Sequence, residues 1–127
     1  MAVSRDDHLP TEAELARLVP AFYARVRSDP MLAPVFNAAV DDWDQHLERL
    51  VSFWSSVLLS SGKYKGNPVA IHGALEPKIT PEMFDRWLEL WDETTDALLP
   101  RLHACALQRK ARLIAESLKL SLYFRLP

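Results

Sequence analysis

The sequence predicts an all-α protein with a single domain. Its 127 residues are 49% hydrophobic and 25% charged, which is the size and composition of a globular chain with one core. Glycine is scarce, at three residues, whereas nine prolines separate stretches in which apolar residues recur at helical spacing. These stretches carry no β-hairpin signals. We therefore expect a helical domain over residues 11–127, preceded by a polar N-terminal segment at residues 1–10.

Charge and cysteine content exclude several classes of protein. The formal net charge is −2, which argues against nucleic-acid binding through bulk electrostatics. Cys105 is the single cysteine, so an internal disulfide and a cysteine-based zinc site are excluded, as expected for a cytoplasmic protein. The polar start is unlike a signal peptide, and no apolar run approaches the roughly 20 residues that span a bilayer. We expect neither a nucleic-acid partner nor a membrane partner.

Capping signals and prolines place the first helices. Thr11-Glu12-Ala13-Glu14 is a capping box that opens a helix. Pro20 is expected to break or kink this helix and to start a second one, which carries Phe22, Tyr23 and Val26 and runs to about Ser28. Asp29-Pro30 should then start one turn that Pro34 ends.

The next helix is unusually apolar and should be central to the fold. Asp42 and Gln45 give it a start that resembles a capping box. One of its faces carries His46, Leu50, Phe53 or Trp54, and Val57, and the adjacent face carries Trp43, Leu47, Val51 and Leu58. A helix with two apolar faces packs against partners on both sides.

Three more helices complete the chain. Asn67-Pro68 should start a very short helix that carries His72 and stops at Gly73. Thr80-Pro81-Glu82 caps a longer helix that ends at Pro100, with Phe84, Trp87, Leu88, Trp91, Thr95 and Leu98 on its apolar stripe. The last helix runs to about Phe124, and we expect Leu102, Ala106, Leu113, Leu120 and Phe124 to face inward, with Arg109, Lys110 and Arg112 on a solvated face.

Four polar side chains stand out on or beside these apolar stripes. They are Tyr23, His46, His72 and Trp87. Each alone can be explained as an ordinary structural residue, because tyrosine, tryptophan and histidine are often buried in a core when the polar atom has a hydrogen-bond partner. Together they supply one metal ligand and three possible hydrogen-bond donors. An apolar slot with one axial imidazole and a donor cluster is what a haem needs to bind a diatomic gas.

A series of short runs resembles the group III truncated haemoglobins. The runs are Phe22-Tyr23-Ala24-Arg25-Val26-Arg27-Ser28-Asp29, Pro34-Val35-Phe36-Asn37, Trp43-Asp44-Gln45-His46-Leu47, Phe53-Trp54, Tyr64-Lys65-Gly66-Asn67-Pro68, His72 with Leu75, and Phe84-Asp85-Arg86-Trp87-Leu88-Glu89-Leu90-Trp91. They occur in the family's order from about residue 11 to residue 124. The resemblance implies a two-over-two helical sandwich that holds haem b in a single globin domain over residues 11–127.

The resemblance also implies roles for individual residues. His72 matches the proximal iron ligand, and Tyr23, His46 and Trp87 match the distal residues that stabilise a bound ligand. The expected haem-contacting residues are Phe22, Phe36, Leu50, Phe53, Trp54, Ile71, His72 and Trp91. Arg49, Lys63 and Tyr64 are candidate propionate partners by charge or position only.

The implied function is the binding of dioxygen, carbon monoxide, nitric oxide or similar ligands, with slow release held back by hydrogen bonds. An enzyme is the alternative, either a nitric-oxide dioxygenase or a peroxidase-like protein, and it would depend on an external reductase. A cofactor-free helical interaction module is a third interpretation and predicts a colourless protein. A di-iron site fails, because the repeated Glu-x-x-His pairs of such bundles are absent.

Overall fold

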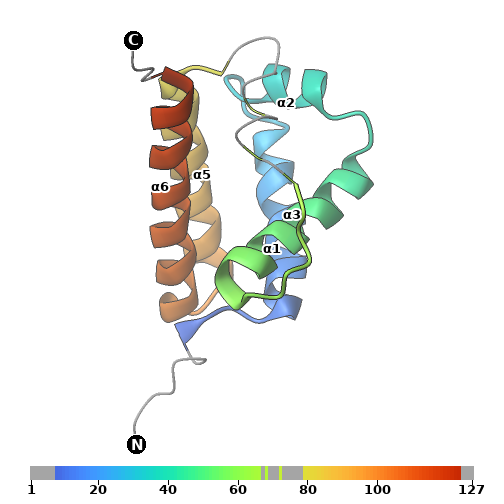
Figure 1. The fold of residues 1–127 in the computed structure, drawn as a ribbon. Coiled ribbons are helices and arrows are strands. Elements are labelled where there is room, and N and C mark those ends of the chain that lie inside the picture. Colours follow the sequence, from blue (N-terminus) through green and yellow to red (C-terminus); the bar gives the residue numbers. More distant parts are fainter. Residues whose placement is uncertain (1–7, 67, 69–71, 73–78, 124–127) are drawn as a thin grey trace, which may run out of the picture.

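The chain folds into two stacked pairs of helices, as seen in the computed structural model (Figure 1). The structure describes residues 8–66, 68, 72 and 79–123, and this part contains five helices and no strand. The helices are α1 (Glu12–Val26), α2 (Ala33–Ala39), α3 (Trp43–Leu59), α5 (Pro81–Leu98) and α6 (Arg101–Tyr123). α1 packs against α3, α5 packs against α6, and α1 also packs against α5, which joins the two pairs. The predicted all-α, two-over-two architecture is confirmed.

Three helices begin at the capping residues that the sequence predicts. The Thr11 hydroxyl accepts a hydrogen bond from the Glu14 N–H (3.1 Å), and the Glu14 carboxylate accepts one from the Thr11 N–H (2.9 Å). This reciprocal pair satisfies two N–H groups that the first turn leaves without helical partners. Asp42 caps α3 by accepting from the Gln45 N–H at 3.1 Å. Thr80 occupies the N-cap position of α5, although its side chain makes no capping hydrogen bond.

The predicted break at Pro20 is wrong, because α1 continues through it. A proline inside a helix lacks the N–H that would bond the carbonyl four residues earlier, here that of Ala16. Both Pro20 and Ala16 are exposed, so water can satisfy this carbonyl. Fully buried residues on both sides of Pro20, including Val19 and Phe22, hold the two halves in one continuous helix.

α2 also differs from the prediction. It begins at Ala33, so Pro34 lies in its first turn and does not end it. Proline is tolerated there, because the N–H groups of the first turn have no helical partner to lose.

The inward face of α6 differs from the predicted one. The buried residues of this helix are Ala104, Leu107, Ala111, Ala115 and Leu118, whereas Leu102, Leu113 and Leu120 are exposed. Phe124 lies outside the described residues. Three of the five buried residues are alanines, whose small side chains let the α6 backbone approach its neighbours closely. Leu107 and Leu118 supply the rest of this buried face, and Leu102, Leu113 and Leu120 are left on the outer surface.

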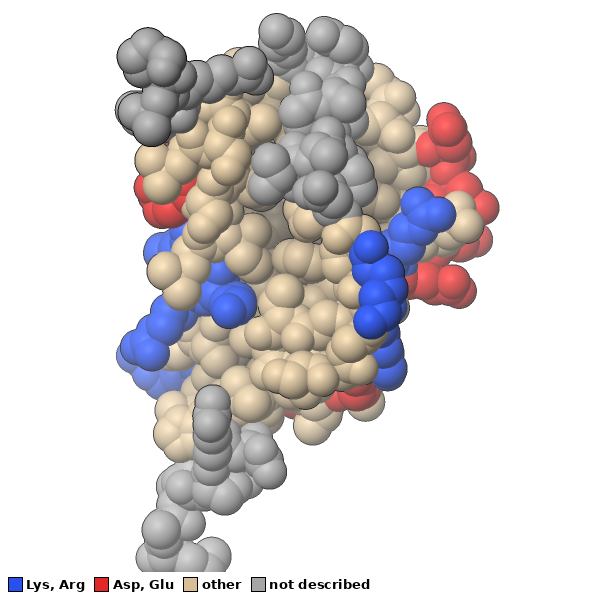
Figure 2. Space-filling view, in the orientation of Figure 1, with Lys and Arg blue, Asp and Glu red and all other residues tan. Residues whose placement is uncertain are grey.

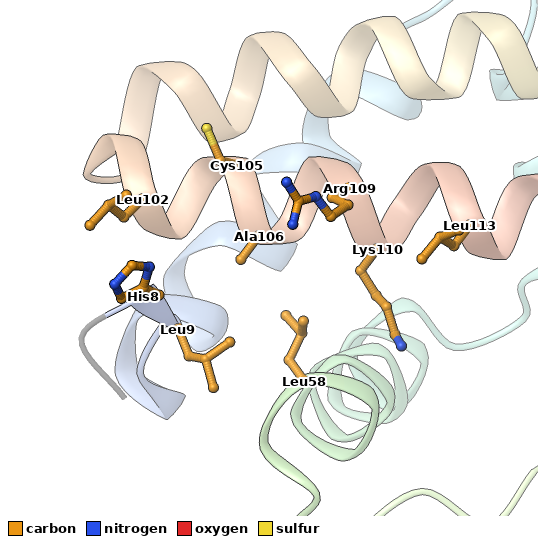
Figure 3. Close-up of a pocket in the computed structure, with 9 residues that line it drawn as sticks. All are labelled: His8, Leu9, Leu58, Leu102, Cys105, Ala106, Arg109, Lys110 and Leu113. Carbon is orange, nitrogen blue, oxygen red and sulfur yellow. The ribbon is translucent and has the colours of Figure 1, made fainter. Parts of the chain in front are cut away.

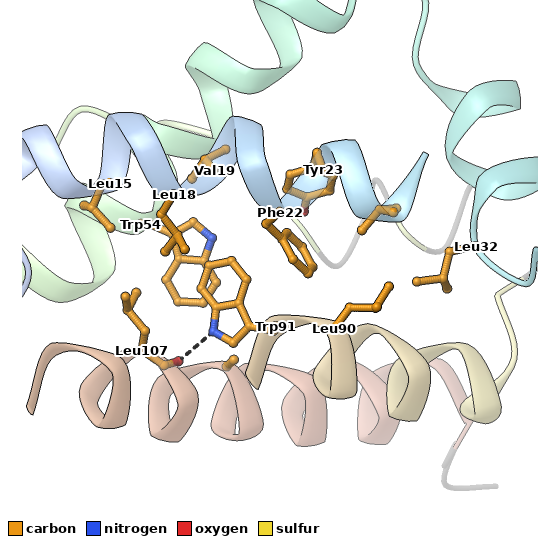
Figure 4. Close-up of a cluster of buried hydrophobic side chains, with 12 residues drawn as sticks. Leu15, Leu18, Val19, Phe22, Tyr23, Leu32, Trp54, Leu90, Trp91 and Leu107 are labelled. Carbon is orange, nitrogen blue, oxygen red and sulfur yellow. Dashed lines mark hydrogen bonds between the residues drawn. The ribbon is translucent and has the colours of Figure 1, made fainter. Parts of the chain in front are cut away.

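An aromatic and aliphatic core fills the space between α1, α3, α5 and α6 (Figure 4). α1 contributes Leu15, Leu18, Val19, Phe22, Tyr23 and Val26, and Trp54, Leu90, Trp91 and Leu107 meet them from the other helices. Trp91 is fully buried, and its indole N–H donates to the Leu107 carbonyl at 3.2 Å. The indole thus buries a large apolar area without leaving its donor unpaired.

Within the described ranges, every helix is too short or too polar to cross a membrane.

A buried carboxylate fixes the turn between α1 and α2. Asp29 is 5% exposed and accepts hydrogen bonds from the Met31 and Leu32 N–H groups, both at 3.1 Å. It also accepts from Arg86 Nε on α5 at 2.8 Å. Burial by itself would raise the pKa of Asp29, but these hydrogen bonds and the Arg86 charge outweigh it and hold the pKa below its ordinary value.

We predict that Asp29→Asn lowers the free energy of unfolding by about 1–3 kcal/mol at pH 7, because the amide loses the charge-assisted bond to Arg86. The folded state lowers the pKa of Asp29, so its stabilisation is complete above the unfolded pKa and is lost as the pH falls through the folded value. The difference between wild type and variant should therefore shrink below about pH 4. Urea unfolding at pH 7 and at pH 3.5 measures this, with exposed Asp41→Asn as control. An equal difference at both pH values would contradict the assignment.

Candidate functional site

Tyr23 lies at the centre of the polar side chains that the sequence singles out. It is 4% exposed, and its ring centroid lies 4.7 Å from Phe22, 5.7 Å from Phe36 and 6.1 Å from His46. Burial raises the pKa of the Tyr23 phenol well above its ordinary value, and a hydrogen bond with Trp87 opposes this only in part. Tyr23 is therefore a neutral O–H donor throughout the physiological pH range.

Trp87 continues a stack of indoles through the core. Its ring lies 5.2 Å from that of Trp91 at an interplanar angle of 14°, and Trp91 stacks on Trp54 at 4.6 Å and 19°. Phe22 meets Trp87 and Trp91 edge-on, with centroids 5.0 Å and 4.8 Å away. Edge-to-face and offset-stacked rings at these separations are favourable, so the orientation of Trp87 is set from two directions.

His46 extends the polar group from α3. It is half-buried and packs edge-on against both Tyr23 and Trp43, the latter at 5.5 Å. Burial lowers the pKa of His46, and the charges of Arg49 and His72 lower it further. The imidazole is therefore predominantly neutral at pH 7, with one nitrogen able to donate and the other able to accept.

His72 lies on backbone with helical conformation and is partly buried. Its Nδ1 lies 2.6 Å from the carbonyl oxygen of Pro68. A carbonyl oxygen only accepts, so Nδ1 carries the proton and the lone pair is on Nε2. This is the tautomer of a histidine whose Nε2 binds a metal. His72 contributes to the lowered pKa of His46, so the two imidazoles lie close enough to interact electrostatically.

Most of the other residues that the sequence predicts to contact the haem lie in or beside the core. The structure brings Phe22, Phe36, Trp54 and Trp91 into or against the core around Tyr23 and Trp87, with Leu50 and Phe53 half-buried on α3 beside them. Ile71 lies outside the described residues. The walls around the polar side chains are thus predominantly aromatic and apolar.

Comparison with known proteins identifies the family. The family model described as bacterial-like globin matches residues 7–115. The group 3 truncated haemoglobin ctb of Campylobacter jejuni subsp. jejuni serotype O:2 is 31% identical over 116 residues, which cover 88% of this chain and 91% of the relative. The chain belongs to the group III truncated haemoglobins. A crystal structure of the group III truncated haemoglobin from C. jejuni superposes with a TM-score of 0.84, covering 91% of this chain and 93% of that one.

Membership in this globin family implies haem binding and a small gaseous ligand, and the described residues fit such a group. The Nδ1–H of His72 is directed to a carbonyl, which leaves the Nε2 lone pair for a metal, the core around Tyr23 is rich in aromatic side chains, and Tyr23 is a buried neutral donor. A neutral, mainly apolar slot suits a flat porphyrin, which gains from the burial of its large apolar area.

The candidate propionate partners of this globin share one cavity. Arg49, Lys63 and Tyr64 line a cavity of about 360 Å³ between α3 and the loop that follows it. Lys63 is partly engaged, because its Nζ lies 3.2 Å from a Glu12 carboxylate oxygen. The Tyr64 ring packs edge-on against Phe53 at 5.2 Å, which connects this cavity to the apolar wall.

Two residues near the site were not singled out from the sequence. Trp43 was assigned to a neighbouring face of α3, but its ring lies 6.0 Å from Tyr23, and the Arg27 guanidinium lies 4.5 Å from its centroid. Its position three residues before His46 places both on one side of the helix and was the available signal. Gly66 lies against Tyr64, so that a Cβ there would overlap the phenol. Only the fold reveals this close approach.

Proposed function

We propose that this truncated haemoglobin holds haem b through Nε2 of His72 and retains a diatomic ligand by hydrogen bonds from Tyr23 and Trp87. When bound, the haem supplies ferrous iron, to which dioxygen, carbon monoxide or nitric oxide can coordinate. The observation that carries the proposal is the hydrogen bond between a buried, neutral Tyr23 and Trp87, with aromatic rings packed against both. The His72–Pro68 hydrogen bond supports the assignment of the ligand nitrogen.

The two donors make retention a better role than delivery. Away from bulk water, the Tyr23 O–H and the Trp87 N–H interact more strongly with the partial negative charge of a bound ligand than they would in solution. A charge-assisted hydrogen bond is worth about 1.5–3 kcal/mol, so one donor slows ligand release roughly tenfold to a hundredfold. Rotation of either donor away from the pocket is opposed by the rings packed around it.

The same polar groups support an enzymatic alternative. Tyr23, Trp87 and the neutral His46 provide donors and one acceptor beside the pocket, as nitric-oxide dioxygenation or peroxide chemistry would require. Such turnover would need electrons from an external reductase. Steady nitric-oxide consumption in the presence of a reductase would favour the enzyme, and stoichiometric binding would favour retention.

We predict that His72→Ala abolishes haem retention at equimolar haem and that added imidazole restores a haem spectrum, because the truncated side chain leaves room for a free ligand. Absorption spectra of the ferric, reduced and carbon monoxide-treated protein measure this. Exposed His8→Ala is the control and should leave the spectra unchanged. A native reduced spectrum of His72→Ala without imidazole would show that another residue holds the iron.

We predict that Tyr23→Phe and Trp87→Phe each speed dioxygen release by about tenfold or more. In the double variant, the increase in the dioxygen release rate should be smaller than the product of the two single increases, because neighbouring donors that share one ligand are coupled. Stopped-flow dissociation of the four proteins measures both quantities. Tyr123→Phe, which removes a hydroxyl that donates to the Ile79 carbonyl in another part of the fold, is the matched control. Fast release from the wild type, unaltered by either substitution, would favour simple carriage.

We predict that His46→Leu changes the ligand association rate more than the dissociation rate. His46 is only half-buried, whereas Tyr23 is buried, so we assign His46 a gating role at the entrance. Flash photolysis of the carbon monoxide complex gives the association rate, and stopped-flow replacement gives the dissociation rate. A large acceleration of dissociation with an unaltered association rate would instead make His46 a direct donor.

A further inference from the structure

A second cavity lies between α6, the C-terminal end of α3 and the residues before α1 (Figure 3). Its volume is about 600 Å³, within the usual range for small-molecule sites. The lining residues are His8, Leu9, Leu58, Leu102, Cys105, Ala106, Arg109, Lys110 and Leu113. We call this cavity the α6 groove. None of its lining residues is among the residues assigned above to the haem site.

The walls of the α6 groove are apolar and accessible. Leu102 is 47% exposed and Leu113 is 60% exposed, and both lie on the face of α6 that does not contribute to the core. Leu58 points from α3 toward α6 on the other side of the groove (Figure 3). Exposed leucines on α6 that face a half-buried leucine on α3 mark a place where an apolar ligand gains free energy by covering them.

The charged residues of the α6 groove are both cations. Arg109 lies along α6 between Ala106 and Leu113, and Lys110 extends toward α3 (Figure 3). Within the described part of the chain neither of them forms an ion pair, whereas Arg112 pairs with Asp92 and Lys119 pairs with Glu116. In Figure 2, basic side chains lie on the α6 side of the molecule and again at the opposite edge, with an uncharged surface between the two groups. Two unpaired cations next to apolar walls complement a ligand with an anionic head and an apolar tail.

We propose that the α6 groove binds a single-chain amphiphile with an anionic head group, of the fatty-acid class. The alkyl chain lies against Leu58, Leu102 and Leu113, and Arg109 and Lys110 bind the carboxylate. The proposal is independent of the function assigned to the haem pocket, because the two sites use different residues.

A second copy of the chain fits this face less well. In an isologous dimer each copy presents the same patch about a two-fold axis. Arg109 and Lys110 lie midway between Leu102 and Leu120, so pairing two α6 helices across these leucines brings the cations of both copies together. Such juxtaposed like charges oppose association, whereas an anionic ligand neutralises them.

Titration calorimetry of the haem-loaded full chain with octanoate, decanoate and laurate, each below its micelle concentration, tests the proposal. Affinity should rise by about tenfold for each two added methylene groups, as expected when the chain is buried. Leu113→Asp should abolish laurate binding, because it places an anion in the apolar wall. Leu120→Asp is the matched control, since Leu120 is 56% exposed on the same helix outside the groove, and it should bind as wild type.

The head-group assignment is tested with the double variant Arg109→Gln/Lys110→Gln. Its affinity for laurate should fall roughly fivefold to tenfold, whereas its affinity for uncharged 1-decanol should be unchanged. Exposed Arg101→Gln, at the start of α6 and outside the groove, is the control for charge loss. The haem absorption spectrum should not change during the titration.

Three results would overturn the proposal. The first is equal laurate binding by wild type and Leu113→Asp, and the second is a laurate-induced change in the haem spectrum that would place the chain in the haem pocket. The third is a wild-type dimer in sedimentation that Leu113→Asp dissociates and laurate does not affect, which would assign the groove to a second copy.

Discussion

The fold depends on one cluster of rings in which helices from both pairs meet. Phe22 of α1, Trp54 of α3, and Trp87 and Trp91 of α5 contact one another through stacked and edge-on rings. Tyr23 follows Phe22 in the chain, and Trp87 lies one turn before Trp91. The positions of the two proposed ligand donors are therefore set by the same packing that stabilises the domain. A close-packed interior resists small displacements, so the donors need no further ordering when a ligand arrives.

Polar interactions fasten the edges of this cluster. The Asp29–Arg86 ion pair ties the α1–α2 turn to α5 one residue before Trp87. Serine hydroxyls hold the loop after α3 in place. Ser55 is hydrogen-bonded to both Glu12 and Ser61, and the Ser56 hydroxyl accepts a hydrogen bond from the Tyr64 N–H at 2.9 Å. This loop leads toward His72. The apolar rings thus fix the donor side of the pocket, while hydrogen bonds fix the approach to the proposed iron ligand.

Much of the architecture could be predicted from the sequence, because helix starts depend on local chemistry. The Thr11 capping box and the Asp42 cap needed only neighbouring residues. The continuity of α1 through Pro20 was not predictable, because it depends on burial supplied by distant helices. The inward face of α6 was misassigned for a related reason, since leucine and alanine positions can both form a stripe and only the partner helix selects between them. For the site, the spacing of apolar residues placed Tyr23 and Trp87 on inward stripes, where Tyr23 is buried and Trp87 half-buried, but their mutual contact required the fold.

We propose that the core and the haem-binding region share the Trp91 cluster. The measurement that tests it most directly is the rate of haem transfer to excess apomyoglobin from Trp91→Leu and from Leu118→Ala. Leu118 belongs to a separate buried cluster with Phe84 and Ala115, and each substitution should cost about 2–5 kcal/mol of unfolding free energy. We predict that Trp91→Leu loses haem at least about tenfold faster than wild type, and that Leu118→Ala, compared under conditions where both variants remain folded, loses it at the wild-type rate. Equal rates of haem loss from the two variants would contradict the claim.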